Sequence, residues 1–341
     1  MELVELGNVC EIKNGYAFKS DQYKSIGTPL LRISNFNNGF VKIDEDQIHV
    51  DKEFIKNKRD FIVTKGDVLI ALSGATTGKY GIYNYDFPSL LNQRIGLIKS
   101  GVSKSLDSKY FFHYLNILRT EILRNAGGAA QPNISTNKIA KLKIPLPPIE
   151  TQKQIAQILD NAAALRDKTQ QLLAEYDQLA QSLFLDMFGD PVTNPKGWDL
   201  LRFKDVLEIR NGKNQKKVLN PKGKYPIYGS GGIMNYADDF ISNENSVVIG
   251  RKGSINNPIL VRQKFWHVDT AFGLNPIRER LDNNYLYYFC VRYNFEQHNK
   301  TVTIPSLAKS TLFEIKIPIP QIHLQNQFAE KIALIEQQKD L

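Results

Sequence analysis

The chain alternates between short apolar runs and polar turns, and it changes to a long helical pattern in its middle. Val68–Leu72 and Val247–Gly250 are rich in branched and apolar side chains, which suit a pleated, buried surface and predict strands. Counted from Ile155, the a and d positions of a heptad pattern are Ile155, Ile158, Ala162, Leu165, Thr169, Leu172, Tyr176, Leu179 and Leu183. A seam of this length predicts a coiled-coil helix, which Gly189 and the prolines after it end.

The first half of the chain is repeated in the second half. Five segments recur in the same order: VELGNVCEIKNG at 4–15 with LRFKDVLEIRNG at 201–212, GDVLIALSGA at 66–75 with NSVVIGRKGS at 245–254, NQRIGL at 92–97 with DTAFGL at 269–274, DSKYFFHYL at 107–115 with DNNYLYYFC at 282–290, and LKIPLPPIETQKQIA at 142–156 with IKIPIPQIHLQNQFA at 315–329. Repeats of this kind indicate repeated structural units. The sequence therefore predicts two similar units, each of mixed α and β structure.

Prolines and the helical pattern set the expected domain limits. The prolines at 145–148 and 318–320 mark the end of each globular part, because proline cannot continue a helix. We expect a first domain over 1–149, a long helix over 150–188, a linker over 189–199, a second domain over 200–321 and a short second helix over 322–341.

Composition and charge add a partner class and a compartment. The 341 residues carry 44 Lys and Arg against 35 Asp and Glu, a net charge of +9 that favours a polyanionic partner such as nucleic acid. Cys10 and Cys290, the two cysteines, lie among apolar residues and are expected as core thiols in a reducing compartment. No signal-like start and no membrane-spanning apolar run occurs, so we expect a cytoplasmic protein with no membrane partner.

Motifs for catalysis, cofactors or metals are weak. SGATTGKY at 73–80 lacks the spacing and final hydroxyl of a phosphate-binding loop, and the five histidines lack metal-ligand spacing. No Asn-Pro-Pro-Tyr-type tetrapeptide of amino-methyltransferases and no acidic metal cluster occurs. The aromatic residues at 110–114 and 285–289 recur at helical spacing and are expected in the cores. A DNA methyltransferase or nuclease with an unrecognised site, or a coiled-coil protein scaffold, stays open as an alternative.

Several of these segments resemble a known family, the specificity subunits of Type I restriction-modification systems. The resemblance covers essentially the whole chain. It is carried by KIPLPPIETQKQIAQILD at 143–160, KIPIPQIHLQNQFAEKI at 316–332, LFLDMFGDPVTNPKGW at 183–198, the openings EIKNGYAF and EIRNGK, and the loop GGAAQPNIS at 127–135.

The resemblance implies a fold and a role. It implies an α+β fold in which two target-recognition domains are joined by long antiparallel coiled-coil helices as an internal pseudo-repeat. It also implies a non-catalytic, sequence-specific subunit that reads a bipartite, asymmetric site in double-stranded DNA. The implied partners are two modification subunits, which use S-adenosylmethionine, and restriction or translocase subunits, which use ATP and Mg. No catalytic residue, cofactor or metal is expected in this chain.

Polar loop residues between the predicted strands are the candidate DNA contacts. Asn and Gln can pair with adenine through two hydrogen bonds and Arg or Lys with guanine, whereas contacts to phosphates add affinity without sequence information. For any one residue, a solvated turn or a phosphate contact competes with base reading. The candidates are Asn35, Asn37, Asn38, Ser73, Thr76, Thr77, Lys79, Gln93, Arg94, Gln131 and Asn133 in the first unit, and Lys213, Asn214, Gln215, Lys216, Lys217, Arg251, Lys252, Ser254 and His267 in the second.

Overall fold

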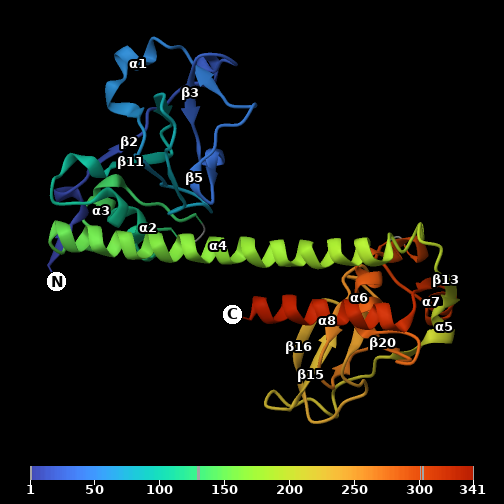
Figure 1. Cartoon of the computed structure of the whole chain (residues 1–341). Helices are drawn as coiled ribbons and strands as arrows, with labels where there is room; N and C mark the ends of the chain where they lie inside the picture. Colours follow the sequence, from blue (N-terminus) through green and yellow to red (C-terminus); the bar gives the residue numbers. More distant parts are fainter. Residues whose placement is uncertain (1, 129–130, 300, 302, 341) are drawn as a thin grey trace. The chain divides into compact units, whose positions relative to one another are not determined.

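The computed structural model describes residues 2–128, 131–299, 301 and 303–340. Residues 129 and 130 of the GGAAQPNIS segment therefore lie outside the described residues. The chain divides into two compact units, Met1–Asp167 (unit 1) and Lys168–Leu341 (unit 2). The division falls inside helix α4 (Ile149–Phe188), which is one continuous helix of 40 residues (Figure 1). The prediction of two mixed α and β units is confirmed.

Unit 1 is built on two sheets. The larger has six strands in the order β2 (Glu11–Asn14), β11 (Ile95–Lys99), β8 (Val68–Ala71), β9 (Tyr80–Ile82), β5 (Gly39–Val41) and β4 (Phe36–Asn37). The smaller has four strands in the order β6 (His49–Val50), β3 (Thr28–Leu31), β10 (Ser89–Leu91) and β7 (Ile62–Val63), and its β3–β10 pair is parallel. A separate antiparallel pair joins β1 (Leu3–Glu5) to β12 (Lys143–Pro145).

Helix α2 (Ser108–Asn125) covers one face of the larger sheet of unit 1. Val68 and Ile70 of β8 pack in one apolar cluster with Phe111 of α2, and Leu69 packs in another cluster on the opposite face. Burial on both faces explains why β8 is a continuous apolar run rather than an alternating one. The short helices α1 (Phe54–Asn57) and α3 (Thr136–Ala140) complete the unit.

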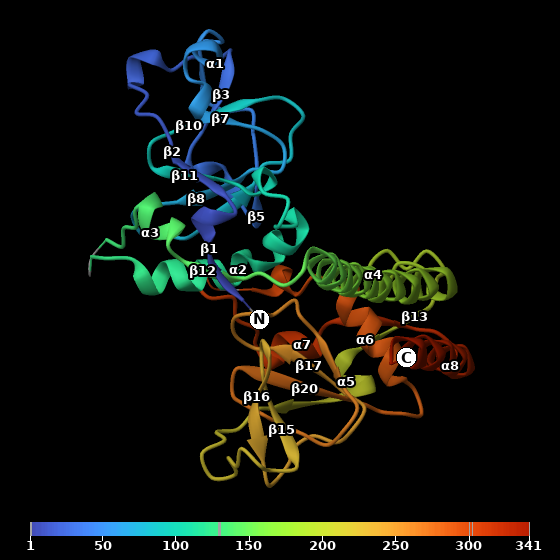
Figure 2. The same cartoon turned by 90° about the vertical axis from the view of Figure 1, so that its left-hand side faces the viewer.

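Unit 2 repeats this plan with fewer strands, and Figure 2 shows its sheets with α5 and α7 nearby. Its larger sheet has the order β14 (Leu207–Asn211), β20 (Ala271–Pro276), β17 (Ser246–Gly250) and β18 (Ile259–Val261). The smaller has the order β16 (Gly232–Ala237), β15 (Tyr225–Gly229) and β19 (Trp266–His267), and β13 (Asp199–Arg202) pairs with β21 (Lys316–Ile319). Its helices are α5 (Phe203–Val206), α6 (Asn283–Arg292), α7 (Lys309–Phe313) and α8 (Ile322–Lys339).

The two units share individual hydrogen bonds as well as a plan. In unit 1 the buried Gln152 of α4 accepts from the backbone N–H of Asp107 (2.9 Å) and donates to the backbone oxygens of Ser105 and Pro147 (2.8 Å each). In unit 2 the buried Gln325 of α8 accepts from the N–H of Asp282 (2.8 Å) and donates to two backbone oxygens in the same way. Each glutamine therefore fixes the start of the aromatic helix in its own unit.

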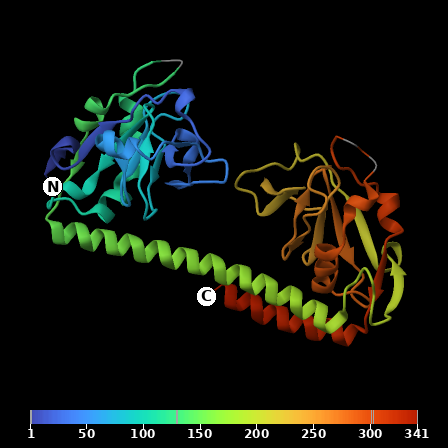
Figure 3. The ribbon, with the colours of Figure 1, turned by 90° about the horizontal axis from the view of Figure 1, so that it is seen from above.

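Within unit 2, α8 runs antiparallel to the end of α4, as Figure 3 shows. Lys339 near the end of α8 pairs with Asp177, whereas Phe328 nearer its start packs edge-on against Phe188 at the end of α4 (ring centroids 5.4 Å). Ala180, Phe184 and Phe188 are the buried residues of this part of α4.

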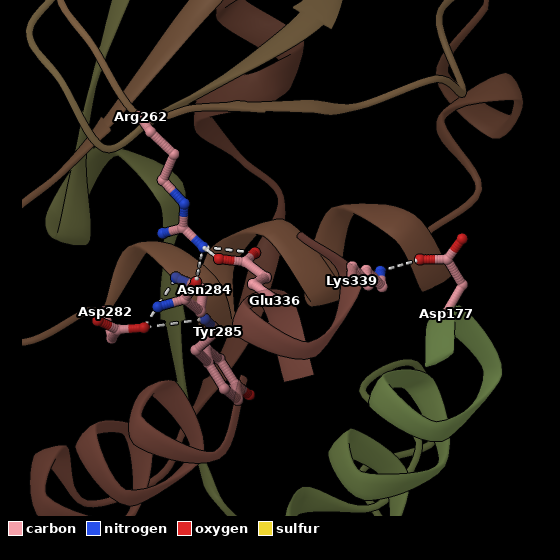
Figure 4. A network of polar contacts seen from close by, with 7 residues as sticks. All are labelled: Asp177, Arg262, Asp282, Asn284, Tyr285, Glu336 and Lys339. Atoms are coloured by element: carbon pink, nitrogen blue, oxygen red, sulfur yellow. Dashed lines mark hydrogen bonds and ion pairs between the residues drawn. The ribbon is translucent and has the colours of Figure 1, made fainter. Parts of the chain in front are cut away.

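A polar network ties α8 to the rest of unit 2 (Figure 4). One guanidinium nitrogen of Arg262, in the loop after β18, donates to both carboxylate oxygens of Glu336 (2.7 and 2.8 Å). The same nitrogen lies 2.8 Å from the side-chain oxygen of Asn284 at the start of α6. Arg262 therefore connects a sheet loop, α6 and α8.

The heptad count is right for only part of the buried face of α4. Its a residues Tyr176 and Leu183 are half-buried, whereas its d residues Ile158, Leu165, Leu172 and Leu179 are 66%, 67%, 45% and 53% exposed in the chain. The buried residues beside α8 are Ala180, Phe184 and Phe188, which are four residues apart and pack into the aromatic core of unit 2. An exposed row of apolar residues spaced by seven consequently remains along α4.

Among the residues that the structure describes, no helix combines the length and the apolar character needed to cross a bilayer. The expected core role of the aromatic residues is confirmed for Tyr110, Phe111, Tyr285, Tyr288 and Phe289, which are buried. Phe112, Tyr114 and Tyr287 are half-buried and pack against the same apolar clusters.

Candidate nucleic-acid interface

Four candidate residues of unit 1 meet at one edge of its larger sheet. Strand β8 ends where β11 begins, because Ala71 pairs with Ile95 in the antiparallel register. Ser73 follows that end of β8, and Gln93 and Arg94 precede that start of β11. Asn133 joins them through a bridge to Ser73.

The segment that carries Asn133 is tied to this edge by backbone hydrogen bonds. The N–H of Gly74 donates to the oxygen of Pro132 (3.0 Å), and the N–H of Ile134 donates to the oxygen of Leu72 (2.9 Å). Gln131 lies next in the same segment and is exposed. Loop residues far apart in the chain thus form one polar surface at the sheet edge.

Unit 2 has the same frame with different side chains. The N–H of Gly253 donates to the oxygen of Pro305 (3.0 Å), and the N–H of Leu307 donates to the oxygen of Arg251 (2.9 Å). Lys252 forms the bridge to Ser306 that Ser73 forms to Asn133 in unit 1. Arg251, Lys252 and Ser254 therefore occupy the matching edge.

Sequence reasoning missed several residues at this edge of unit 2. A pocket of about 380 Å³ beside Arg251 is also lined by His298, Ser306 and Lys309. The signal that could have revealed Ser306 is the match between Pro132-Asn133 and Pro305-Ser306, which the repeat comparison left out. Burial lowers the pKa of His298, whose Nε2 lies 2.6 Å from the hydroxyl of Tyr293.

The structure corrects one part of the repeat comparison. The N–H of Ile95 donates to the oxygen of Asn92, and the N–H of Ala271 donates to the oxygen of Val268. Ile95 therefore corresponds to Ala271 rather than to Phe272, and the NQRIGL and DTAFGL segments were aligned one residue out of register. In the corrected register, Gln93 corresponds to Asp269 and Arg94 to Thr270.

A second group of candidates in unit 1 lies at two hairpins. Asn38 has φ 46° and Gly39 has φ 84°, the left-handed backbone of a tight turn between β4 and β5. Asn37, Asn38 and Lys79 line a pocket of about 480 Å³ together with Asn116 and Arg119 of α2, which the sequence did not single out. Thr76 is exposed in the loop that leads to Lys79.

The lysine-rich loop after β14 is anchored at its first residue. The backbone oxygen of Lys213 accepts from Nε1 of Trp266 (2.9 Å), and its N–H donates to the oxygen of His267 (3.0 Å). Asn214, Lys216 and Lys217 are exposed, and the side-chain oxygen of Asn214 accepts from the N–H of Lys216 (2.9 Å). Gln215 is half-buried at the turn.

Three of the candidate residues have side chains that make contacts inside the fold and are not presented at the surface. Thr77 is 3% exposed, and its hydroxyl lies 2.8 Å from the oxygen of Gly74 and 2.7 Å from that of Pro132, so its assignment as a DNA contact is wrong. His267 is fully buried, and its assignment is also wrong. The amide of Asn35 is occupied by Arg32, Lys42 and Gln47 at 2.6 to 2.9 Å.

Burial also controls the chemistry of the ionisable groups in the cores. It lowers the pKa of His267 from 6.5 to about 4, and Nε2 of this ring lies 3.2 Å from the backbone oxygen of Arg210. It raises the pKa of the Cys10 thiol to about 12 and raises that of Cys290 as well. Over the described part of the chain, no group of three His, Cys, Asp or Glu side chains has the arrangement of a metal site.

A further pocket of unit 1, of about 440 Å³, lies where β3 and β10 end. Arg32, Ser34, Gln93 and Arg94 line it with the ring of Tyr23. Arg32 was missed because it directly follows the apolar run of β3 and carries no turn signal.

Comparison with known proteins identifies the family. The model for the Type I restriction modification DNA specificity domain matches residues 1–175 and 195–340. The chain is 23% identical to the MjaVIII specificity subunit of Methanocaldococcus jannaschii, covering 92% of this chain and 79% of that protein. It is also 23% identical to the putative MjaX specificity subunit of the same organism, covering 98% and 86% of the two chains.

A solved structure shares the fold. The type I restriction-modification S subunit from M. genitalium aligns with a TM-score of 0.64 and 16% identity over 99% of this chain and 90% of that one. Since the family model matches both repeated parts, this chain belongs to the family of type I restriction-modification specificity subunits.

Proposed function

We propose that the chain reads a bipartite, asymmetric DNA target, with unit 1 contacting one half and unit 2 the other. The observation that carries this proposal is the shared edge of the two larger sheets, where matching backbone hydrogen bonds hold different polar side chains. Gly74 to Pro132 in unit 1 matches Gly253 to Pro305 in unit 2, yet Ser73 is replaced by Lys252. Two units that recognise different DNA sequences need the same backbone arrangement to present different side chains to the bases, and this is the arrangement of the two sheet edges.

The chain acts as the recognition subunit of a larger complex, as its family membership indicates. Two modification subunits, with S-adenosylmethionine, would supply methylation, and restriction or translocase subunits, with ATP and Mg, would complete the complex. The exposed apolar row at Ile158, Leu165, Leu172 and Leu179 supports docking of a partner protein along α4. The excess of 44 basic over 35 acidic residues favours association with the DNA backbone.

The test is to sequence methylated bases in cells that contain this chain and its modification subunits. We expect methylation at a split motif. A second version of the chain, with the residues of segments 73–79 and 131–135 of unit 1 replaced except for the buried ones, should change one half of the motif and leave the other half as it was. The matched control replaces the exposed residues of the equivalent segments 252–258 and 304–308 of unit 2, which should change the other half. Simultaneous change of both halves, or methylation by the chain without modification subunits, would contradict the proposal.

A further inference from the structure

We propose that unit 1 recognises a guanine through Arg94, with Arg32 beside it in the pocket at the ends of β3 and β10. The inference rests on the proposed function and adds to it the base that one half of the target must contain. It is carried by a turn fixed by hydrogen bonds, by two arginines that form no ion pair with any described residue, and by the absence of both arginines from the matching turn of unit 2.

The turn that carries Arg94 is fixed by backbone hydrogen bonds on each side. The N–H of Asn92 donates to the oxygen of Leu31 (3.1 Å), and the N–H of Ile95 donates to the oxygen of Asn92 (3.1 Å). The oxygen of Arg94 itself accepts from the N–H of Leu72 (3.0 Å). Hydrogen bonds to Leu31 at the end of β3 and to Leu72 just after β8 thus hold this turn, while Arg94 is exposed.

Arg32 reaches the same pocket from a neighbouring strand. Strands β3 and β10 are parallel, and Leu31 pairs with Leu91, so Arg32 and Asn92 leave the sheet at the same edge. The side-chain oxygen of Asn35 accepts from the N–H of Arg32 (2.8 Å) and fixes the backbone there. Asn35 is therefore a positioning residue for Arg32.

Neither guanidinium group forms an ion pair within the part of the chain that the structure describes. Arg32 and Arg94 line the pocket of about 440 Å³ together with Gln93 and Ser34. The arginine ion pairs of the described residues engage other side chains, namely Arg124, Arg166, Arg202, Arg210, Arg262 and Arg292. Two unpaired guanidinium groups in one polar pocket favour a ligand rich in hydrogen-bond acceptors.

The equivalent turn of unit 2 has the same backbone and no arginine. The N–H of Val268 donates to the oxygen of Tyr228 (2.9 Å), and the N–H of Arg251 donates to the oxygen of Thr270 (2.8 Å), as Asn92 and Leu72 do in unit 1. Arg32 and Arg94 therefore correspond to Gly229 and Thr270. Because folding of the turn does not require arginine, the pair in unit 1 serves recognition.

Guanine is the base that this geometry fits. Its major-groove edge presents two acceptors, O6 and N7, which match two parallel donors of one guanidinium group. A turn fixed by these backbone hydrogen bonds restricts where Arg94 can reach, and such restriction suits a base edge that must be met at one position. A phosphate contact would be satisfied by a less constrained cation.

The test compares Arg94→Thr with the parent chain, each assembled with its modification subunits, on a duplex pool randomised over both half-sites. Thr is the residue that the same turn carries in unit 2, so the variant should keep the fold. We expect roughly 5- to 150-fold weaker binding to the selected sequence and loss of preference at one G·C pair in the half assigned to unit 1. The control Arg166→Ala removes one exposed positive charge on α4 and should leave the preferred motif unchanged.

Three other outcomes would be distinguishable. Equal weakening on every sequence, with the slope of log affinity against log salt reduced by about 0.9, would identify a phosphate contact and overturn the guanine assignment. Relaxation at an A·T pair would overturn it too. If the parent complex selects no motif at all, the proposed function fails together with this inference.

Discussion

At the scale of single residues, the structure separates polar side chains that serve the surface from those that serve the core. His267 illustrates the difference, because it lies two residues before an exposed Asp269 and is itself fully buried. Its Nε2 is near the oxygen of Arg210, and its ring packs where Gly273 has no side chain. At the corresponding position, unit 1 has Leu91.

Burial of His267 predicts a pH effect on stability. The pKa is about 4 in the folded chain and 6.5 when exposed, so the unfolded state binds the proton first as the pH falls. The free energy of unfolding should therefore decrease below about pH 6.5 and level off near the folded pKa. Between about pH 7 and pH 5, this one residue contributes a loss of about 2 kcal/mol.

The variant His267→Leu, which introduces the residue of unit 1, isolates this contribution. Urea unfolding followed by circular dichroism at several pH values should show a smaller acid-dependent loss than in the parent chain. His323→Leu, at an exposed position of α8, is the matched control for the loss of one imidazole. An unchanged slope in His267→Leu would show that this imidazole does not control acid stability.

At the scale of elements, side chains from the helices that follow the prolines hold the aromatic helices in place. Gln325 of α8 is fully buried and satisfies the N–H of Asp282 and the oxygens of Arg280 and Pro320 around the start of α6. The same three contacts recur at Gln152 in unit 1. Such repetition explains why the KIPLPP and KIPIPQ segments are alike in sequence.

Replacement of this glutamine by an apolar residue of similar size should be costly. Gln325→Leu removes three hydrogen bonds and leaves the buried oxygen of Pro320 and the partly buried N–H of Asp282 without this partner, and we expect the free energy of unfolding to fall by about 3 kcal/mol. Gln327→Leu, at an exposed position two residues further on, should change it by less than about 0.5 kcal/mol. Chemical denaturation of the two variants and the parent gives the comparison. Equal stabilities of the two variants would show that the buried hydrogen bonds are not what stabilises this junction.

At the scale of the whole molecule, α4 is a continuous helix shared by the two units. Residues 169–175 of this helix are exposed throughout, so their deletion removes no buried contact of the chain. The deletion shortens the helix by about 10 Å, or roughly three base pairs of duplex axis. If α4 sets the distance between the two half-sites, the deleted chain should keep both half-site preferences and favour a shorter gap.

The preferred spacer length is measured by binding the assembled complex, at constant salt, to duplexes that have fixed half-sites and varied spacers. The control is the substitution of the same seven residues by a different heptad of helix-forming residues with Leu172 retained, which should keep the parent spacer. A folded and assembled deletion variant with the parent spacer optimum would exclude a measuring role for α4.

The sequence alone was sufficient for the repeat, the two mixed units and the location of the long helix. These follow from local patterns, since β-branched runs, proline positions and helical periodicity act over short stretches of chain. The family resemblance likewise came from contiguous segments such as 143–160 and 316–332, which carry the buried glutamines and the strands before them.

Tertiary structure alone decided which polar residues face solvent and which register the strands adopt. The sequence predicts Thr77 and His267 as loop residues that contact DNA, but segments distant in the chain pack over them and bury them. A shift of one residue along a strand exchanges its two faces. Gly96 and Gly273 align in the sequence, but the strand pairing places Gly96 opposite Ile70 and Gly273 opposite Val248, which are not equivalent positions in the two units. The aromatic core around Phe184 and Phe328 determines which face of α4 is buried in unit 2, and a heptad pattern within one helix does not include these tertiary contacts. Arg32 and Arg94 line one pocket because the parallel strands β3 and β10 end side by side, although these strands lie about sixty residues apart in the chain.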